Sequence, residues 1–115
     1  MNNYEMEFTF IGVNDDGLAE RQTGKSASIC GNAREALEMF YIGLEFNKKR
    51  LHPSVRYQSQ ILTTGDIDMI KIPRMTKIKL VIGENTDEII GNTVETIYNV
   101  AYGSALMTGC KVERI

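Results

Sequence analysis

The side chains that most often perform catalysis or bind metal ions are scarce in this chain. Its 115 residues include one histidine, His52, and two cysteines, Cys30 and Cys110. A zinc hydrolase that works alone usually needs three protein ligands and a general base. One imidazole does not meet that requirement, and no nucleophile stands at a recognisable spacing from a base. We therefore expect no catalytic residue, no metal site and no cofactor in this chain.

The remaining reactive groups have ordinary structural explanations. His52 stands at the end of an expected helix, where an imidazole is commonly solvated or caps the helix. The adjacent carboxylates Asp15 and Asp16 lie near glycines, which is typical of a solvated turn rather than of a Ca²⁺ site. Cys30 and Cys110 lie 80 positions apart, so two separate thiols are expected, with a disulfide or a metal site as the alternatives.

Charge and hydropathy exclude further classes of partner. Thirteen basic and fifteen acidic side chains give a net charge of −2, which provides no attraction to nucleic acid or to anionic lipid. No apolar run is long enough to cross a membrane, and residues 1–20 lack the cationic start and apolar core of a signal peptide. We expect a cytoplasmic protein that binds neither nucleic acid nor membrane.

The elements that would position a site follow from the periodicity of apolar residues. Alternation predicts strands over residues 4–10, 55–62, 76–82 and 110–115, with a long exposed loop at 13–28. Helical spacing predicts helices over about 30–50 and 85–108, the second beginning with a capping box of Asn85 and Glu88. The first helix should bury Ala33, Ala36, Leu37, Phe40 and Leu44. The second should bury Ile90, Val94, Ile97, Ala101 and Ala105.

The order strand, helix, strand, strand, helix, strand predicts an α+β fold. It is the order of the ferredoxin-like βαββαβ sandwich, in which two helices cover one face of a four-stranded antiparallel sheet. A chain of 115 residues has room for one domain, so residues 1–115 are expected to form a single unit. Two cysteines cannot bind an iron–sulfur cluster, and a third strand without aromatic residues argues against RNA recognition.

Several short segments carry a more specific resemblance, which extends from Phe8 to Glu113. They occur in a characteristic order and spacing: Phe-Ile-Gly at 10–12, Gly-Asn-Ala at 31–33, Thr-Thr-Gly at 63–65, Ile-Pro at 72–73, and Ser-Ala-Leu-Met-Thr-Gly at 104–109. Together they resemble the dimerisation, or lid, domain of the zinc metallopeptidases of family twenty. That family includes aminoacylases, carboxypeptidase G and aminobenzoyl-glutamate-type amidohydrolases.

The resemblance implies a lid inserted into a separate catalytic domain, so zinc would be expected only in that parent domain. In the family, the lid usually contributes a histidine that completes the active site of the opposite subunit. It also binds substrate through an asparagine and an arginine. Spacing from Gly65 and Pro73 places Ser59, Ile70 and Gly83 at these three positions. None of the three has the side-chain chemistry of the residue it replaces, and the loop after Gly12 departs from the family pattern as well.

Three hypotheses follow. The first is a non-catalytic dimerisation domain of an amidohydrolase-like metallopeptidase, which forms a homodimer through a sheet edge and the adjacent helix and has its own catalytic domain as a further partner. The second is a free-standing ferredoxin-like module that binds a small ligand or regulates, with the loop at 13–28 as its motivation. The third is retained zinc-dependent hydrolase activity. The aromatic residues that could face a partner are Tyr41, Phe46, Tyr98 and Tyr102.

Overall fold

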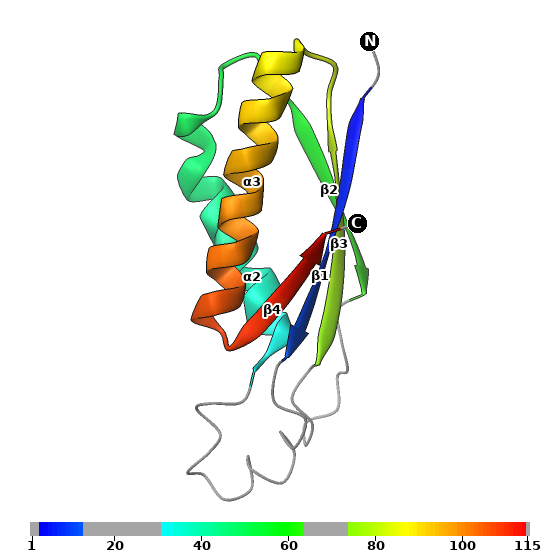
Figure 1. Ribbon diagram of the computed structural model, residues 1–115, viewed down its shortest axis with the longest axis vertical. Helices are drawn as coiled ribbons and strands as arrows, with labels where there is room; N and C mark the ends of the chain where they lie inside the picture. The colour runs from blue at the N-terminus through cyan, green and yellow to red at the C-terminus, as the bar shows by residue number, and fades with distance from the viewer. Residues whose placement is uncertain (1–2, 13–30, 64–73, 115) are drawn as a thin grey trace, which may run out of the picture.

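The chain forms one antiparallel sheet with two helices on the same side of it. The computed structural model describes residues 3–12, 31–63 and 74–114. Strands β1 (Tyr4–Gly12), β2 (Tyr57–Thr63), β3 (Met75–Ile82) and β4 (Cys110–Arg114) pair in the order β2-β3-β1-β4. Helices α2 (Ala33–Asn47) and α3 (Asp87–Met107) pack side by side against this sheet (Figure 1), and the 3-10 turn η2 (Lys48–Arg50) continues α2. The predicted α+β, ferredoxin-like fold is confirmed.

Several residues discussed above lie outside the described ranges. They are Cys30, the loop at 13–28 with Asp15 and Asp16, and Ile70.

Strand β1 is the centre of the sheet because it pairs with β3 on one side and with β4 on the other. Its alternating residues Met6, Phe8 and Phe10 are all buried beneath the helices. Phe8 stands opposite Ile78 of β3 and Arg114 of β4. The period-two pattern of the sequence therefore matches the face that the helices cover.

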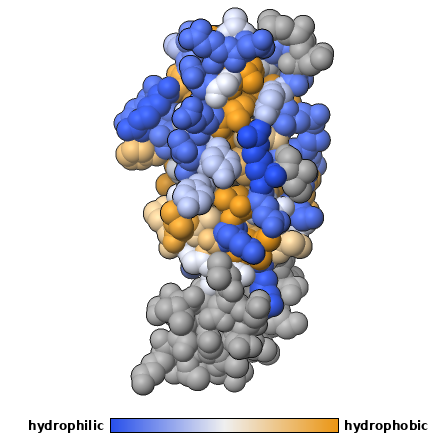
Figure 2. All heavy atoms as spheres, in the orientation of Figure 1, coloured by the Kyte–Doolittle hydropathy of each residue, from blue (hydrophilic) through white to orange (hydrophobic). Residues whose placement is uncertain are grey.

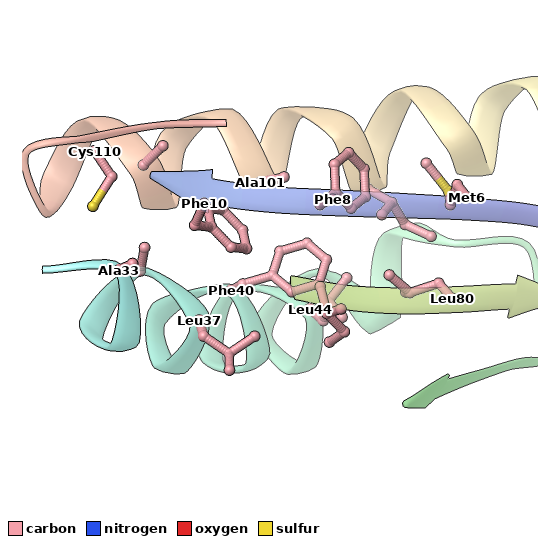
Figure 3. Packing of buried hydrophobic residues seen from close by; sticks show 14 of the residues in the cluster. Met6, Phe8, Phe10, Ala33, Leu37, Phe40, Leu44, Leu80, Ala101 and Cys110 are labelled. Carbon is pink, nitrogen blue, oxygen red and sulfur yellow. The ribbon is translucent and has the colours of Figure 1, made fainter. Parts of the chain in front are cut away.

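The core is built around a cluster of aromatic rings (Figure 3). The ring of Phe40 on α2 lies 5.6 Å from the ring of Phe8 and 5.7 Å from that of Phe10, measured between centroids. All five residues predicted to be buried on α2 are buried. Cys110 closes one end of the core as a free thiol. Burial raises the pKa of this thiol, so it stays protonated at neutral pH and is a poor nucleophile.

Helix α3 buries a different set of residues from the one predicted. Ile97, Ala101 and Ala105 are buried as expected, but Thr93 and Ser104 are buried with them. Each of these two hydroxyl groups donates a hydrogen bond of 2.8 Å to the backbone carbonyl four residues earlier. This bond satisfies the hydroxyl inside the helix, so a threonine or a serine can take a core position.

Both helices begin with a side-chain cap, and one of them differs from the prediction. The Asn32 side chain accepts hydrogen bonds from the backbone N–H groups of Arg34 and Glu35, at 3.0 and 3.1 Å. The predicted cap of α3 was wrong, because Thr86 rather than Asn85 accepts from the N–H of Ile89. The Asn85 side chain instead accepts from the N–H of Thr86. The helix therefore starts one residue later than the capping-box pattern indicates.

We expect Asn32→Ala to destabilise the fold by about 1 kcal/mol, because two N–H groups in the first turn of α2 lose their acceptor. Urea denaturation monitored by circular dichroism measures the change. Asn99→Ala is the matched control, since Asn99 is an exposed asparagine in the middle of α3 and caps nothing. Equal stability of the two variants would contradict the capping role of Asn32.

Candidate functional site

Two of the three lid positions inferred from the resemblance lie in the described part of the chain. Ser59 is on β2, where its hydroxyl lies 3.1 Å from the hydroxyl of Tyr41 on α2. Gly83 follows β3 directly, and its N–H donates to the carbonyl of Arg56 at 2.8 Å. Ser59 pairs with Leu80, so Gly83 is three positions further along β3, or about 10 Å away. The structure therefore places Ser59 within β2 and Gly83 just after β3 without bringing them together. Ile70 lies outside the described residues.

Strand β2 forms one edge of the sheet, and the helices leave it largely uncovered. Helix α2 packs on β3 and β1, whereas α3 packs on β4 and β1. Five of the seven residues of β2, those from Gln58 to Leu62, are exposed. Ile61 and Leu62 are 41% and 43% exposed. The strand sequence Tyr-Gln-Ser-Gln-Ile-Leu-Thr contains no charge and no proline, two features that often keep an edge strand from pairing with another strand. Its pairing with β3 is regular from Tyr57 to Ile61 and shifts register between Ile61 and Thr63.

The opposite edge of the sheet, strand β4, is protected against pairing with another strand. Strand β4 contains Lys111, Glu113 and Arg114 among its five residues, and charged side chains disfavour the pairing of one edge with another. The guanidinium of Arg114 donates a hydrogen bond to the hydroxyl of Tyr4. It also lies over the ring of Tyr4, 5.9 Å from the centroid. Of the two edge strands in the described part of the chain, β2 is therefore the better suited to accept a further strand.

The sheet face away from the helices carries a charged pair. The ammonium of Lys79 on β3 lies 2.7 Å from a carboxylate oxygen of Glu5 on β1. The hydrogen bond that Lys79 donates to Glu5, together with the negative charge of that carboxylate, raises the pKa of Lys79. Lys77 stands opposite Thr9 in the same register. A face of this kind is compatible with direct contact with water, so it needs no partner to cover it.

The helices expose a second apolar surface, which includes most of the aromatic residues singled out from the sequence. Figure 2 shows apolar side chains over the C-terminal half of α3 and along its border with the sheet. The rings of Tyr98 and Tyr102 are stacked, with centroids 6.4 Å apart. On α2, Phe46 is 63% exposed and its ring lies under the ammonium of Lys49. The large exposed apolar residues of the two helices are Ile42, Phe46, Tyr98, Tyr102, Leu106 and Met107.

His52 takes part in a local hydrogen-bond chain that the sequence did not reveal. Its Nδ1 accepts from the N–H of Ser54 at 3.1 Å and lies 2.7 Å from the hydroxyl of Ser54. The Asn85 side chain donates to the same hydroxyl at 2.9 Å. These bonds connect the segment after η2 with the segment before α3. All three bonds are exposed, and the bond between Asn85 and Ser54 is the one that joins the two segments.

Within residues 3–12, 31–63 and 74–114, no three His, Cys, Asp or Glu side chains lie close enough together to hold a metal ion. No helix in these ranges combines the length and the apolar character that a membrane span requires. Every buried polar side-chain atom in the same ranges has a hydrogen-bond partner.

Comparison with known proteins finds likeness in structure but not in sequence. No protein-family model and no curated protein matches the chain. The aminobenzoyl-glutamate utilization protein from Klebsiella pneumoniae matches with a TM-score of 0.71 and 18% identity, over 97% of this chain and 27% of that one. A hydantoinase/carbamoylase family amidase from Burkholderia ambifaria matches with a TM-score of 0.73 and 12% identity, over 98% and 26%.

A dinuclear metal-binding peptidase of family twenty from Bacillus subtilis matches with a TM-score of 0.59 and 17% identity, over 98% of this chain and 24% of that one. The chain thus spans about a quarter of the length of each of these structures. At these identities the likeness is one of fold. The resemblance inferred from the sequence segments is confirmed at that level: the chain has the fold of one part of several amidohydrolases and peptidases.

Proposed function

We propose that this chain is a non-catalytic dimerisation, or lid, domain of an amidohydrolase- or peptidase-like protein, and that it joins two copies through β2. The likeness of fold to a quarter of such proteins supports the assignment as a lid. The observation that carries the proposed assembly is the exposed, uncharged edge of β2. In the sheet formed by the described residues β2 is a terminal strand, and the outer backbone N–H and C=O groups of such a strand can pair with a further strand.

A two-fold axis through the middle of β2 produces this pairing with one self-complementary surface. Gln60 is the central residue of the strand Tyr57–Thr63. In the proposed antiparallel register it faces Gln60 of the second copy, and Tyr57 faces Thr63. The two sheets then form one continuous sheet, with α2 of each copy beside the junction. Tyr41 is held on that side of α2 by its hydrogen bond to Ser59.

The proposal assigns catalysis to another part of a longer protein. The solved structures that match are about four times as long as this chain, and zinc would be held in the catalytic domain of such a protein. Ser59, Ile70 and Gly83 would then be lid positions whose substrate contacts have changed. The apolar surface on α3, which includes Tyr102 and Leu106, would be covered by that further domain.

We expect Gln60→Lys to weaken the dimer about tenfold or more. The substitution puts two ammonium groups opposite each other near the proposed two-fold axis, where like charges repel. Sedimentation velocity over a series of protein concentrations measures the dissociation constant. Raising the salt concentration should restore part of the affinity, because ions screen exposed charges.

Asn99→Lys is the matched control, since it makes the same chemical change at an exposed position of α3, away from β2. Its dissociation constant should equal that of the unmodified chain. If Gln60→Lys leaves the dimer intact, the dimer does not form through β2. If both variants dissociate equally, the effect is one of net charge rather than of the strand edge.

A further inference from the structure

The outer surface of the two helices, on the side away from the sheet, exposes apolar residues that pairing through β2 does not cover. Ile42 on α2 and Leu106 and Met107 on α3 are each more than half exposed. Ile42 stands two positions from the buried residues Phe40 and Leu44, so helical geometry points it away from the sheet. The two helices run side by side in opposite directions (Figure 1), and these apolar residues therefore belong to one helical layer.

Gly103 lies on this surface, and the described chain does not explain why the residue is glycine. It follows Val100, whose side chain meets α2 at Gly43, by about one turn. Among the described glycines only Gly109 has a positive φ. A Cβ atom at position 103 would meet no atom within 4 Å. Glycine inside a helix is less stable than alanine, but it allows another molecule to approach the backbone closely.

The two helices give this surface a negative charge. Each of them has three exposed acidic side chains: Glu35, Glu38 and Glu45 on α2, and Asp87, Glu88 and Glu95 on α3. The basic residue within the helices is Arg34, which lies seven positions before Tyr41 and thus on the flank that faces β2. The basic residues of η2 follow at the far end of α2, where Lys48 pairs with Glu45 and Lys49 lies over Phe46.

Some of these carboxylates lie next to the exposed apolar residues. Glu38 precedes Ile42 by four positions and Glu35 precedes it by seven, so both are on the same side of α2 as Ile42. Glu95 precedes Leu106 by eleven positions, which is about three turns and again the same side of the helix. The surface is therefore apolar around Gly103 and acidic at its borders.

This charge decides which occupant the surface fits. A second copy of the chain would bring the same carboxylates against it, and like charges repel across an interface. An anionic lipid surface is repelled for the same reason. A helix suits the shape, since a third helix can pack along the line between two others. Its apolar stripe then needs basic residues at the borders to pair with the carboxylates.

We propose that the outer surface of α2 and α3 binds a basic amphipathic helix of the further domain, with the apolar stripe of that helix over Gly103 and its cations beside Glu35, Glu38 and Glu95. The source of the helix rests on the proposed function, in which a further domain covers the apolar surface of α3. Its chemistry rests on the charges and exposed residues of this chain alone.

The test is a titration of the full chain with a synthetic leucine–lysine peptide, followed by ¹⁵N–¹H chemical shifts. The peptide has about 18 residues, or five turns, with its leucines on one face. We expect shifts at the amides of Ile42, Gly103 and Leu106, with a dissociation constant on the order of 10 μM. The same peptide with glutamate in place of lysine should bind at least about tenfold more weakly. So should a peptide of equal composition whose leucines are spread around the helix.

Absence of shifts at these amides, or equal binding of the three peptides, would overturn the proposal. Two other occupants are outcomes of the same experiment. If the three amides shift with protein concentration in the absence of peptide, a second copy occupies the surface. If vesicles of anionic lipid shift them instead of the peptide, the surface binds membrane. Either result would contradict the proposal.

Gly103→Ala should have opposite effects on stability and on binding. We expect the melting temperature to rise by about 2–5 °C, because alanine favours the helix. The dissociation constant for the leucine–lysine peptide should rise at least about fivefold, because the new methyl group stands where the peptide backbone approaches.

Gly91→Ala is the matched control, since a Cβ at position 91 of α3 also meets no atom within 4 Å. Gly91 lies about 18 Å further along the helix and a third of a turn around it. This variant should be stabilised to a similar extent and bind the peptide unchanged. Unchanged binding by Gly103→Ala, or equal loss in both variants, would contradict the close approach at Gly103.

The double variant Glu35→Gln/Glu38→Gln should weaken binding of the peptide about tenfold at low salt, because two charge pairs are lost. The control is Glu84→Gln/Glu113→Gln, which removes the same charge from two exposed positions outside both helices. It should bind at least about fivefold more tightly than the first double variant. Equal loss in the two double variants would show that only the net charge attracts the peptide, which would contradict a specific surface.

The same titration in the Gln60→Lys variant separates this proposal from the proposed assembly. Gln60 is on β2 and outside the helices, so this variant should bind the peptide as the unmodified chain does, whether or not the dimer dissociates. Loss of binding in that variant would contradict a surface formed by α2 and α3 of a single chain.

Discussion

Phe40→Ala should lower the free energy of unfolding by about 3–5 kcal/mol, which is a large part of the total stability of a domain of this size. Phe40 is fully buried and packs between the rings of Phe8 and Phe10. Alanine removes the ring and leaves a cavity that these neighbours cannot fill without moving. We expect the melting temperature to fall by about 10–20 °C. Phe40→Leu, which keeps most of the volume, should cost far less.

Phe46→Ala makes the same chemical change six positions later on α2, at a site that is 63% exposed. It should alter the stability by no more than about 0.5 kcal/mol. All variants are compared by urea denaturation at one protein concentration, so that any dimerisation contributes equally. Similar losses for Phe40→Ala and Phe46→Ala would mean that the core does not lie between α2 and β1 as described.

Gly43→Ala should destabilise the fold by about 1–3 kcal/mol because it separates the two helices. A Cβ atom at position 43 would lie 2.6 Å from Cγ1 of Val100 on α3, well inside van der Waals contact. Gly103→Ala is the matched control, since a Cβ at position 103 of α3 meets no atom within 4 Å. There the higher helix propensity of alanine should instead stabilise the fold by about 0.5–1 kcal/mol.

The clash has a specific partner, so a second substitution should relieve it. We expect Val100→Ala to recover most of the loss caused by Gly43→Ala, although Val100→Ala alone is destabilising. Such non-additivity is the signature of direct contact between two residues. Additive effects of the two substitutions would contradict the close crossing of α2 and α3 at Gly43.

The sequence predicted the fold well where one physical cause dominates. On α2, the apolar residues that recur every three or four positions are all buried. On β1 the alternation of Met6, Phe8 and Phe10 marks the buried face correctly. Each of these patterns depends on hydrophobic burial alone, and the spacing of apolar residues along the sequence indicates directly which face is buried.

The sequence predicted α3 less well, because there the hydrogen bonds of polar side chains, and not only hydrophobic burial, determine which residues are buried and which residue caps the helix. Thr93 and Ser104 occupy core positions on α3 because their hydroxyls bond to backbone carbonyls within the same helix. Hydropathy does not register such a bond. Asn85 and Thr86 are both good caps, and the three-residue spacing to Glu88 favoured the wrong one. The choice between them depends on a tertiary contact, since Asn85 also bonds to Ser54.

The sequence did not predict the contacts between residues on different helices and strands. Alternation in β2 indicated one buried face, but the strand lies beyond the cover of both helices and is exposed on both faces. The bond between Tyr41 and Ser59 joins residues 18 positions apart, and the proximity of Arg56 to Gly83 depends on strand register. Gly83 was singled out only by resemblance.

The exposure and the charge of the two edge strands explain why the proposed dimer forms through β2. Both β2 and β4 end the sheet, but β4 carries Lys111, Glu113 and Arg114. Strand β2 carries no charged residue and exposes Ile61 and Leu62. The proposal therefore assigns strand pairing to β2 and not to β4.

Sedimentation equilibrium of the unmodified chain tests the central claim most directly. The account predicts a mass of twice the 12.9 kDa chain at tens of micromolar, with reversible dissociation on dilution. A single species of 12.9 kDa at every concentration in that range would contradict a dimerisation domain.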